Sequence, residues 1–202
     1  LFKLDEARTC HEKALFIKKE IGDRRGEATA YNDLGNVYMS VGNYGKAKEC
    51  YEQALAIDKE TNSLRTQAID YGHLGSVHNM LGDYGKAYVL HKKALELKIR
   101  ANEDTEEDKE SLSKEYSNLG CLCLSLGEFV KAKKLFKKAL CIIQQMFDRR
   151  TEAQILANLA SLELSLGEEK KSKQYCEKAL EIAEACGDVK VILQVCGIIG
   201  NA

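Results

Sequence analysis

The sequence contains no proline, although a chain of 202 residues with average composition would contain about ten. Proline breaks helices because it removes a backbone donor, so only glycine is left here to interrupt long helical segments. The hydrophobic fraction of 45% and the charged fraction of 30% are typical of a soluble globular protein. These features predict an all-α fold.

The chain also lacks an excess of either charge and any long apolar run. Its 30 basic and 31 acidic side chains give a formal net charge of −1, which argues against a nucleic-acid or a membrane partner. Apolar runs such as residues 191–193 are far shorter than the roughly 18 residues of a membrane span. The opening residues LFKLDEARTC have no signal-peptide layout. We expect a cytoplasmic location, with the nucleus as the alternative.

The cysteines do not form the short, loop-rich framework of a secreted disulfide domain. They lie inside helical patterns, so we expect reduced thiols. The eight are Cys10, Cys50, Cys121, Cys123, Cys141, Cys176, Cys186 and Cys196.

Three series of residues share one period, which is the signature of a repeat solenoid. The first series consists of alanines followed by leucine, spaced by 40, 40, 45 and 40 residues. The second consists of Leu-Gly pairs and their variants at the same intervals, and the third marks turns. The series are Ala14, Ala54, Ala94, Ala139 and Ala179; Leu34-Gly35, Leu74-Gly75, Leu119-Gly120, Leu159-Ala160 and Ile199-Gly200; and Gly42-Asn43-Tyr44, Gly82-Asp83-Tyr84, Gly127-Glu128-Phe129 and Gly167-Glu168-Glu169.

Each repeat is predicted to contain two helices joined by a turn. Gly42 suits the left-handed position that ends a helix, and Asn43 suits the N-cap of the next one. Gly35, Ala47 and Ala54 are expected where the two helices cross, because larger side chains would hold the backbones apart. The helix propensity lost at such a glycine, about 1 kcal/mol, is offset by close packing.

These positions resemble the tetratricopeptide repeat family, whose pattern runs aromatic, Leu-Gly, Tyr, then Ala, aromatic, Ala. The resemblance implies a right-handed superhelical solenoid of antiparallel helix pairs. The period of 40, compared with the usual 34 or so, is similar to that of spindle-orientation scaffolds with Leu-Gly-Asn repeats and of kinesin light chains. The matching positions are Tyr31, Leu34-Gly35, Tyr38, Ala47, Tyr51 and Ala54; Tyr71, Leu74-Gly75, His78, Ala87, His91 and Ala94; Tyr116, Leu119-Gly120, Cys123, Ala132, Phe136 and Ala139; and, degraded, Leu156, Leu159-Ala160, Glu163, Ser172, Cys176 and Ala179.

We predict a single array over residues 1–202 that is truncated at both ends. Five extra residues fall within 101–110, where they form either a solvated loop or helix extension, or an acidic patch that selects basic ligands. The predicted parts are a second helix at 1–21, repeats at 23–62, 63–102, 103–147 and 148–187, and a partial first helix at 188–202.

In such arrays the first helices line a concave surface that binds peptides. The positions there that packing does not use are polar and nearly uncharged. Asn36, Asn118 and Asn158 are candidates to hydrogen-bond the main chain of an extended peptide, unless these amides only satisfy neighbouring backbone or water. The candidate residues are Asn32, Asp33 and Asn36; His73, Ser76 and Asn79; Lys114, Ser117, Asn118 and Cys121; and Gln154, Asn158 and Ser161.

Family members that bind chaperone tails use a clamp of lysine, asparagine and arginine on these helices. The matching positions here retain only one lysine beside the asparagines, which argues against binding of a free C-terminal carboxylate. These positions are Asn32, Asn36, His73, Lys114 and Asn118.

No pattern indicates a metal, a cofactor or catalysis. His78, His91 and Cys123 are a conceivable zinc set, but they occupy packing positions and no C-x₂-C pair accompanies them. The sequence has no phosphate loop, no G-x-S-x-G and no H-E-x-x-H. We predict a non-enzymatic segment.

The leading interpretation is a scaffold or adaptor that binds a peptide segment of a partner protein. The alternative is a regulatory or sensor segment of a larger signalling protein, which restrains a catalytic domain elsewhere. A third interpretation is end-to-end self-association through apolar ends. The residues expected to be exposed there are Leu1, Phe2, Leu4, Ile198 and Ile199.

Overall fold

The computed structural model describes residues 2–101 and 105–200, and these form helices and short turns without any strand. The all-α prediction is confirmed. The chain divides into two compact units, an N-terminal unit of residues 1–101 and a C-terminal unit of residues 102–202. The prediction of one array did not include this division, which falls at the acidic insertion. The helices of the N-terminal unit are α1 (Phe2–Glu20), α2 (Arg24–Ser40), α3 (Tyr44–Glu60), α4 (Leu64–Met80) and α5 (Tyr84–Ala101); those of the C-terminal unit are α6 (Glu106–Ser125), α7 (Phe129–Met146), α8 (Arg149–Ser165), α9 (Glu169–Cys186) and α10 (Val189–Gly200).

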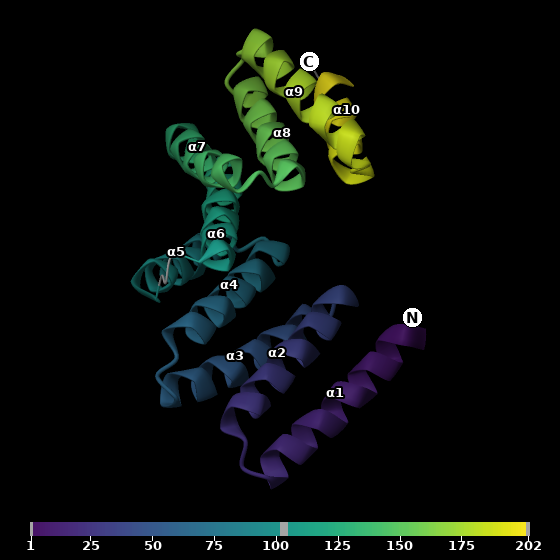
Figure 1. Ribbon diagram of the computed structural model, residues 1–202, viewed down its shortest axis with the longest axis vertical. Coiled ribbons are helices and arrows are strands. Elements are labelled where there is room, and N and C mark those ends of the chain that lie inside the picture. The colour runs from purple at the N-terminus through teal and green to yellow at the C-terminus, as the bar shows by residue number, and fades with distance from the viewer. Residues whose placement is uncertain (1, 102–104, 201–202) are drawn as a thin grey trace. The chain divides into compact units, whose positions relative to one another are not determined.

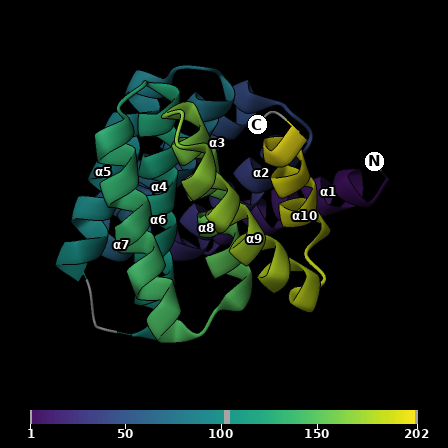
Figure 2. The same ribbon diagram turned by 90° about the horizontal axis from the view of Figure 1, so that it is seen from above.

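Successive helices pair within each unit. In the N-terminal unit α2 packs on α3 and α4 on α5, while in the C-terminal unit α6 packs on α7 and α8 on α9 (Figures 1 and 2). Gly42 ends its helix at a φ of +75°, as predicted. The side chain of Asn43 then accepts a hydrogen bond from the Lys46 backbone N–H at 3.2 Å and caps α3, also as predicted.

The turns between repeats include two residues other than glycine in the left-handed region. Asn62 has a φ of 55° and Phe147 a φ of 57°. Asparagine tolerates this conformation, whereas phenylalanine has no compensating local hydrogen bond. The Phe147 side chain is 85% exposed and gains little from packing.

The glycines of the Leu-Gly positions lie directly against rings from the paired helix. A Cβ added to Gly35 would lie 2.4 Å from the Tyr51 ring, and one added to Gly120 would lie 2.6 Å from the Phe136 ring. Both rings are buried. His91 occupies the same position opposite Gly75 in the pair between these two. The prediction of small residues at the helix crossings is confirmed.

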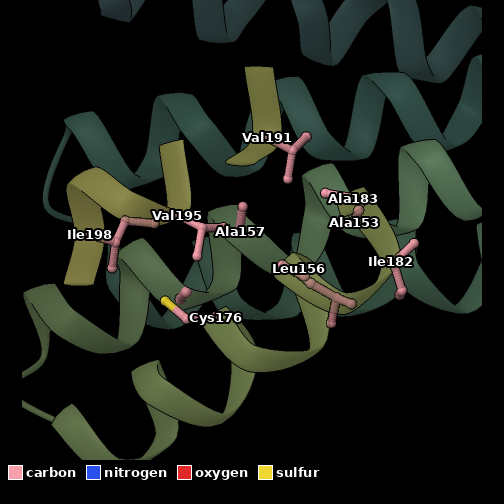
Figure 3. Close-up of a cluster of buried hydrophobic side chains, with 11 residues drawn as sticks. Ala153, Leu156, Ala157, Cys176, Ile182, Ala183, Val191, Val195 and Ile198 are labelled. Atoms are coloured by element: carbon pink, nitrogen blue, oxygen red, sulfur yellow. The ribbon is translucent and has the colours of Figure 1, made fainter. Parts of the chain in front are cut away.

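The α8–α9 crossing uses a different combination of side chains. Ala160 replaces the glycine, and Cys176 replaces the ring; both are buried. They belong to a cluster in which α8, α9 and α10 converge on one another (Figure 3). The other members are Ala153, Leu156, Ala157, Ala179, Ile182, Ala183, Val191, Val195 and Ile198.

Within each unit, one repeat is joined to the next by contact between a second helix and the following first helix. At the α3–α4 joint, the neighbouring residues Asp58 and Asp70 are both buried, and Asp70 Oδ2 accepts no hydrogen bond from a described residue. Burial, together with the neighbouring Asp58 carboxylate, raises the pKa of Asp70 to about 7, against a partial opposing effect of the Asn32 amide. The equivalent positions at the α7–α8 joint hold Ile143 and Ile155, which are also buried.

Candidate functional site

The thirteen candidate residues lie on the first helices of the repeats, and none of them is buried. We refer to these thirteen side chains as the first-helix face. In the N-terminal unit they come from α2 and α4, and in the C-terminal unit they come from α6 and α8. Their role in binding a ligand stays a prediction, but their hydrogen bonds show which of them retain free donors.

Asn32 connects α2 to α4 in the N-terminal unit. Its Nδ2 donates to Asp70 Oδ1 at 2.7 Å, and its Oδ1 lies 3.1 Å from His73 Nδ1. The His73 ring in turn lies 4.6 Å from the Tyr51 ring, measured between centroids. Asn32 and His73 therefore stabilise the contact between neighbouring repeats, and their polar groups are largely occupied.

Asn36 has a different environment on the same helix. It is exposed, and its Oδ1 accepts a hydrogen bond from the Tyr51 hydroxyl at 2.8 Å. Burial raises the pKa of Tyr51, which keeps the phenol protonated and able to donate. This bond fixes the orientation of the amide and leaves its two N–H donors facing outward.

The remaining candidates of this unit make local contacts. Asp33 Oδ2 lies 3.5 Å from His11 Nδ1 of α1, which is an ion pair when the imidazole is protonated. Ser76 Oγ donates to the Gly72 carbonyl within its own helix at 3.0 Å. Asn79 is exposed near the end of α4.

In the C-terminal unit, Asn158 belongs to a chain of hydrogen bonds across three helices. Its Nδ2 donates to Cys121 Sγ of α6 at 3.6 Å, and its Oδ1 accepts from Gln194 Nε2 of α10 at 3.1 Å. Gln154 Nε2 donates to Gln194 Oε1 at 2.7 Å. Gln194 was not among the predicted residues, although it lies one 40-residue period after Gln154 and could have been found from that spacing.

Asn118, by contrast, is exposed and makes no hydrogen bond with the described part of the chain. Nearby on α6, Lys114 Nζ pairs with Glu110 Oε1 at 2.7 Å. Ser117 is half-buried. Ser161 Oγ of α8 donates to the Ala157 carbonyl at 3.2 Å. Of the three asparagines proposed from sequence, Asn36 and Asn118 keep free donors, whereas the Asn158 amide is already hydrogen-bonded to Cys121 and Gln194.

The conceivable zinc residues are not brought together. His91 is 2% exposed and packs against Gly75, while His78 Nδ1 lies 3.7 Å from Asp83 Oδ2. Cys123 Sγ lies 3.7 Å from Glu128 Oε2 in the C-terminal unit. Burial, followed by the Glu128 charge, raises the pKa of Cys123 to about 11 and keeps the thiol neutral. Across residues 2–101 and 105–200, no three metal-binding side chains are grouped.

All eight cysteines are free thiols. Among the described helices, none has the length and apolar character needed to cross a membrane.

Two family profiles, both described as tetratricopeptide repeat, match the chain. One covers residues 1–60, and the other covers residues 116–144 and 153–186. The matched ranges together exceed half of the sequence, and they coincide with helix pairs built on the crossings described above. The chain belongs to the tetratricopeptide repeat family. No curated protein sequence matches it.

Solved structures share the fold. BtubC (BKLC) from P. vanneervenii has a TM-score of 0.80 and 24% identity, with 92% of this chain and 75% of that chain covered. Kinesin light chain TPR-like repeats from Podosopora anserina have a TM-score of 0.70 and 17% identity, with 90% of this chain and 88% of that chain covered. Aspartyl phosphate phosphatase F from Bacillus subtilis gives 0.83 and 17%, with coverage of 98% and 52%, so this chain spans about half of that protein. At these identities the likeness concerns the fold alone.

Proposed function

We propose that this chain is a protein-interaction module that holds an extended peptide segment of a partner against the first-helix face. The observation that carries the proposal is that each unit presents a free carboxamide on its own part of this face, Asn36 in the N-terminal unit and Asn118 in the C-terminal unit. A carboxamide can donate to a peptide carbonyl and accept from a peptide N–H, so it recognises main chain without demanding a particular side chain.

The neighbouring side chains support the same assignment. Ser76 bonds to its own helix and is short, which leaves room beside it for ligand side chains. A Rap protein with the same fold has been solved in complex with Competence and Sporulation Factor, at a TM-score of 0.77 and 18% identity, with 96% of this chain and 54% of that chain covered. That ligand belongs to the Rap protein, and here it supports only the general use of the fold.

The test is binding of a displayed library of random peptides to the purified chain. Peptides that the chain selects are expected to lose most of their affinity when Asn36 and Asn118 are both changed to alanine. Gln53→Ala, at an exposed position on the second helix α3, is the matched control and should have no effect. Selected peptides that bind the double variant as tightly as the parent would refute the use of this face.

A second candidate is a regulatory repeat segment that binds another part of its own protein. The observation that favours it is that the same fold forms about half of a longer solved protein, aspartyl phosphate phosphatase F, of which this chain spans 52%. Under either proposal the segment supplies a binding surface and no catalytic group. Competition between a selected peptide and flanking sequence in a longer chain would distinguish a regulatory segment from an independent adaptor.

Self-association through apolar ends has less support. Leu1 and the side chain of Phe2 lie outside the described residues. Ile198 was expected to be exposed, but it is 8% exposed because it packs in the α8–α9–α10 cluster. Ile199 is 53% exposed, and Leu4 is half-buried. Sedimentation that is independent of concentration would exclude this mode.

A further inference from the structure

The second helix α7 carries a charge that no other described helix matches. Its 18 residues, FVKAKKLFKKALCIIQQM, contain five lysines and no acidic residue. On the surface of the C-terminal unit, a groove of about 330 Å³ is lined by residues of α7 and α9, with Glu163 of α8 also contributing. Four lysines line it, and these are Lys133, Lys137, Lys171 and Lys178.

Glu163 occupies the position that Tyr38 holds in the first full repeat and is one of the departures from the family pattern. It is 1% exposed, and Lys133 Nζ lies 2.5 Å from its Oε1. This close ion pair occupies Oε1, whereas Oε2 accepts no hydrogen bond from a described residue. A buried carboxylate with unused acceptor capacity is costly unless something donates to it.

The lysines that line the groove are only partly neutralised within the structure. Lys133 pairs with Glu163, and Lys171 pairs with Glu168 at 3.1 Å. Lys137 and Lys178 are exposed and form no ion pair with the described residues. Four lysines and one glutamate give the lining a net charge of +3. Such a groove attracts a ligand rich in negative charge.

We propose that this α7–α9 groove is a second binding site, which takes an acidic peptide segment of a partner protein. Side-chain carboxylates of the peptide pair with Lys137 and Lys178, while a backbone N–H donates to Glu163. A peptide supplies both kinds of group, whereas a bare phosphate chain supplies only the acceptors. The site lies mainly on the second helices α7 and α9, with Glu163 from the first helix α8, and it uses none of the thirteen side chains of the first-helix face, so it stands independently of the proposed function above.

The first experiment measures fluorescence anisotropy of a labelled oligoglutamate peptide titrated with the full chain. Binding is expected to weaken as salt is raised, and to fall about tenfold or more in the Lys137→Glu, Lys178→Glu double variant. The control is the Lys48→Glu, Lys92→Glu double variant, which changes net charge equally through a half-buried and an exposed lysine on second helices of the N-terminal unit. Equal losses in both variants would overturn the groove as the site.

Glu163→Gln separates a peptide site from a general anion surface. The neutral amide accepts more weakly than the carboxylate, so peptide affinity is expected to fall about threefold to tenfold. Affinity for inorganic tripolyphosphate, which has no N–H to donate, should rise or stay the same because one negative charge is removed. If both ligands bind more tightly to the variant, Glu163 acts only by repulsion and the peptide assignment fails. Circular dichroism of each variant checks that the fold is retained.

The acidic first turn of α6, with Glu106, Glu107 and Asp108, offers another occupant in the form of a second copy of the chain. Self-association that is lost in the Lys137→Glu, Lys178→Glu variant would assign the groove to that contact and overturn a separate partner. A monomer at all concentrations, together with oligoglutamate binding, supports the proposal.

Discussion

The two units join successive repeats through different chemistry at equivalent positions. In the N-terminal unit, Asp58 and Asp70 meet at the α3–α4 joint, whereas Ile143 and Ile155 occupy the same positions at the α7–α8 joint. Both pairs are buried. The isoleucines contribute apolar burial, while the aspartates hold two carboxyl groups away from water. The repeat therefore fixes where a side chain lies without fixing whether that position stabilises the fold at neutral pH.

The helix crossings give a second comparison, in which the two residues change together. Gly120 accommodates the Phe136 ring in the α6–α7 pair, and Ala160 lies with Cys176 in the α8–α9 pair. A larger residue on one helix accompanies a smaller residue on the other. In both pairs the space between the helices is filled by the two side chains together. Neither a glycine nor an aromatic ring is required at the crossing.

The largest expected effect comes from removing the ring at one crossing. Phe136→Ala is expected to destabilise the chain by about 3–5 kcal/mol, because it leaves a cavity that the surrounding helices fill only partly. Cys176→Ala, at the equivalent position of the next pair, removes a single sulfur atom and should cost much less. Urea unfolding followed by circular dichroism measures both. Similar costs would show that the two crossings do not differ as described.

The aspartate joint is expected to make stability depend on pH. The folded-state pKa of Asp70 is about 7, above the ordinary value of 3.8, so the folded chain binds this proton more tightly than the unfolded chain. Its contribution is fully present below about pH 4 and is lost as pH rises through about 7. Asp70→Asn should flatten this dependence and stabilise the chain at pH 8 by about 1–3 kcal/mol. Urea unfolding from pH 5 to pH 8 tests this, with Glu49→Gln, at an exposed position of α3, as the control.

The comparison of the crossings predicts that the effect of Gly120→Ala on stability changes sign when its partner Phe136 is replaced. Gly120→Ala in the parent should cost about 1–3 kcal/mol, because the new methyl group overlaps the Phe136 ring. In a Phe136→Cys background the same change should instead stabilise by up to about 1 kcal/mol, through the higher helix propensity of alanine. A double-mutant cycle by urea unfolding measures this coupling. Additive effects would contradict the proposed interlock.

On the first-helix face, a smaller difference in the stability cost of substitution is expected between two asparagines. Asn158→Ala is expected to cost about 1 kcal/mol, since it breaks the hydrogen bonds that link α6, α8 and α10. Asn118→Ala should change stability by less than about 0.5 kcal/mol, because that amide has no partner in the described chain. Thermal unfolding of the two variants side by side is sufficient. The reverse order would mean that the free and committed amides are wrongly assigned.

The smallest effect is expected at the turn before α8. Phe147 adopts a left-handed conformation that Gly187 adopts one repeat later. Phe147→Gly should stabilise by about 0.5 kcal/mol, because relief of the backbone strain slightly exceeds the entropy cost of glycine. Gly187→Phe should have the opposite effect. Both are measurable as shifts in the urea midpoint.

The sequence located the helix pairs because their signals are local or strictly periodic. Gly42 and Asn43 specify a turn and a cap within a few residues, and the Leu-Gly spacing aligns the crossings. The state of the candidate amides was not predictable in this way. Asn36 and Asn158 are both asparagines on first helices, but their partners on other helices differ. The Tyr51 hydroxyl donates to Asn36 Oδ1 and leaves its N–H donors free, whereas Cys121 Sγ accepts from Asn158 Nδ2. The α7–α9 groove was missed because Glu163 was treated only as a degraded aromatic position.

The interlock of glycine and ring also constrains the order in which such a crossing can diverge. A glycine–phenylalanine pair that became alanine–phenylalanine first would pass through a clash between the new methyl group and a buried ring that has no free space to move into. If the ring is lost first, the intermediate holds a void, which costs stability but does not force the helices apart. A crossing like that of Ala160 and Cys176 is therefore most readily reached by shrinking the ring before the backbone gains its methyl group.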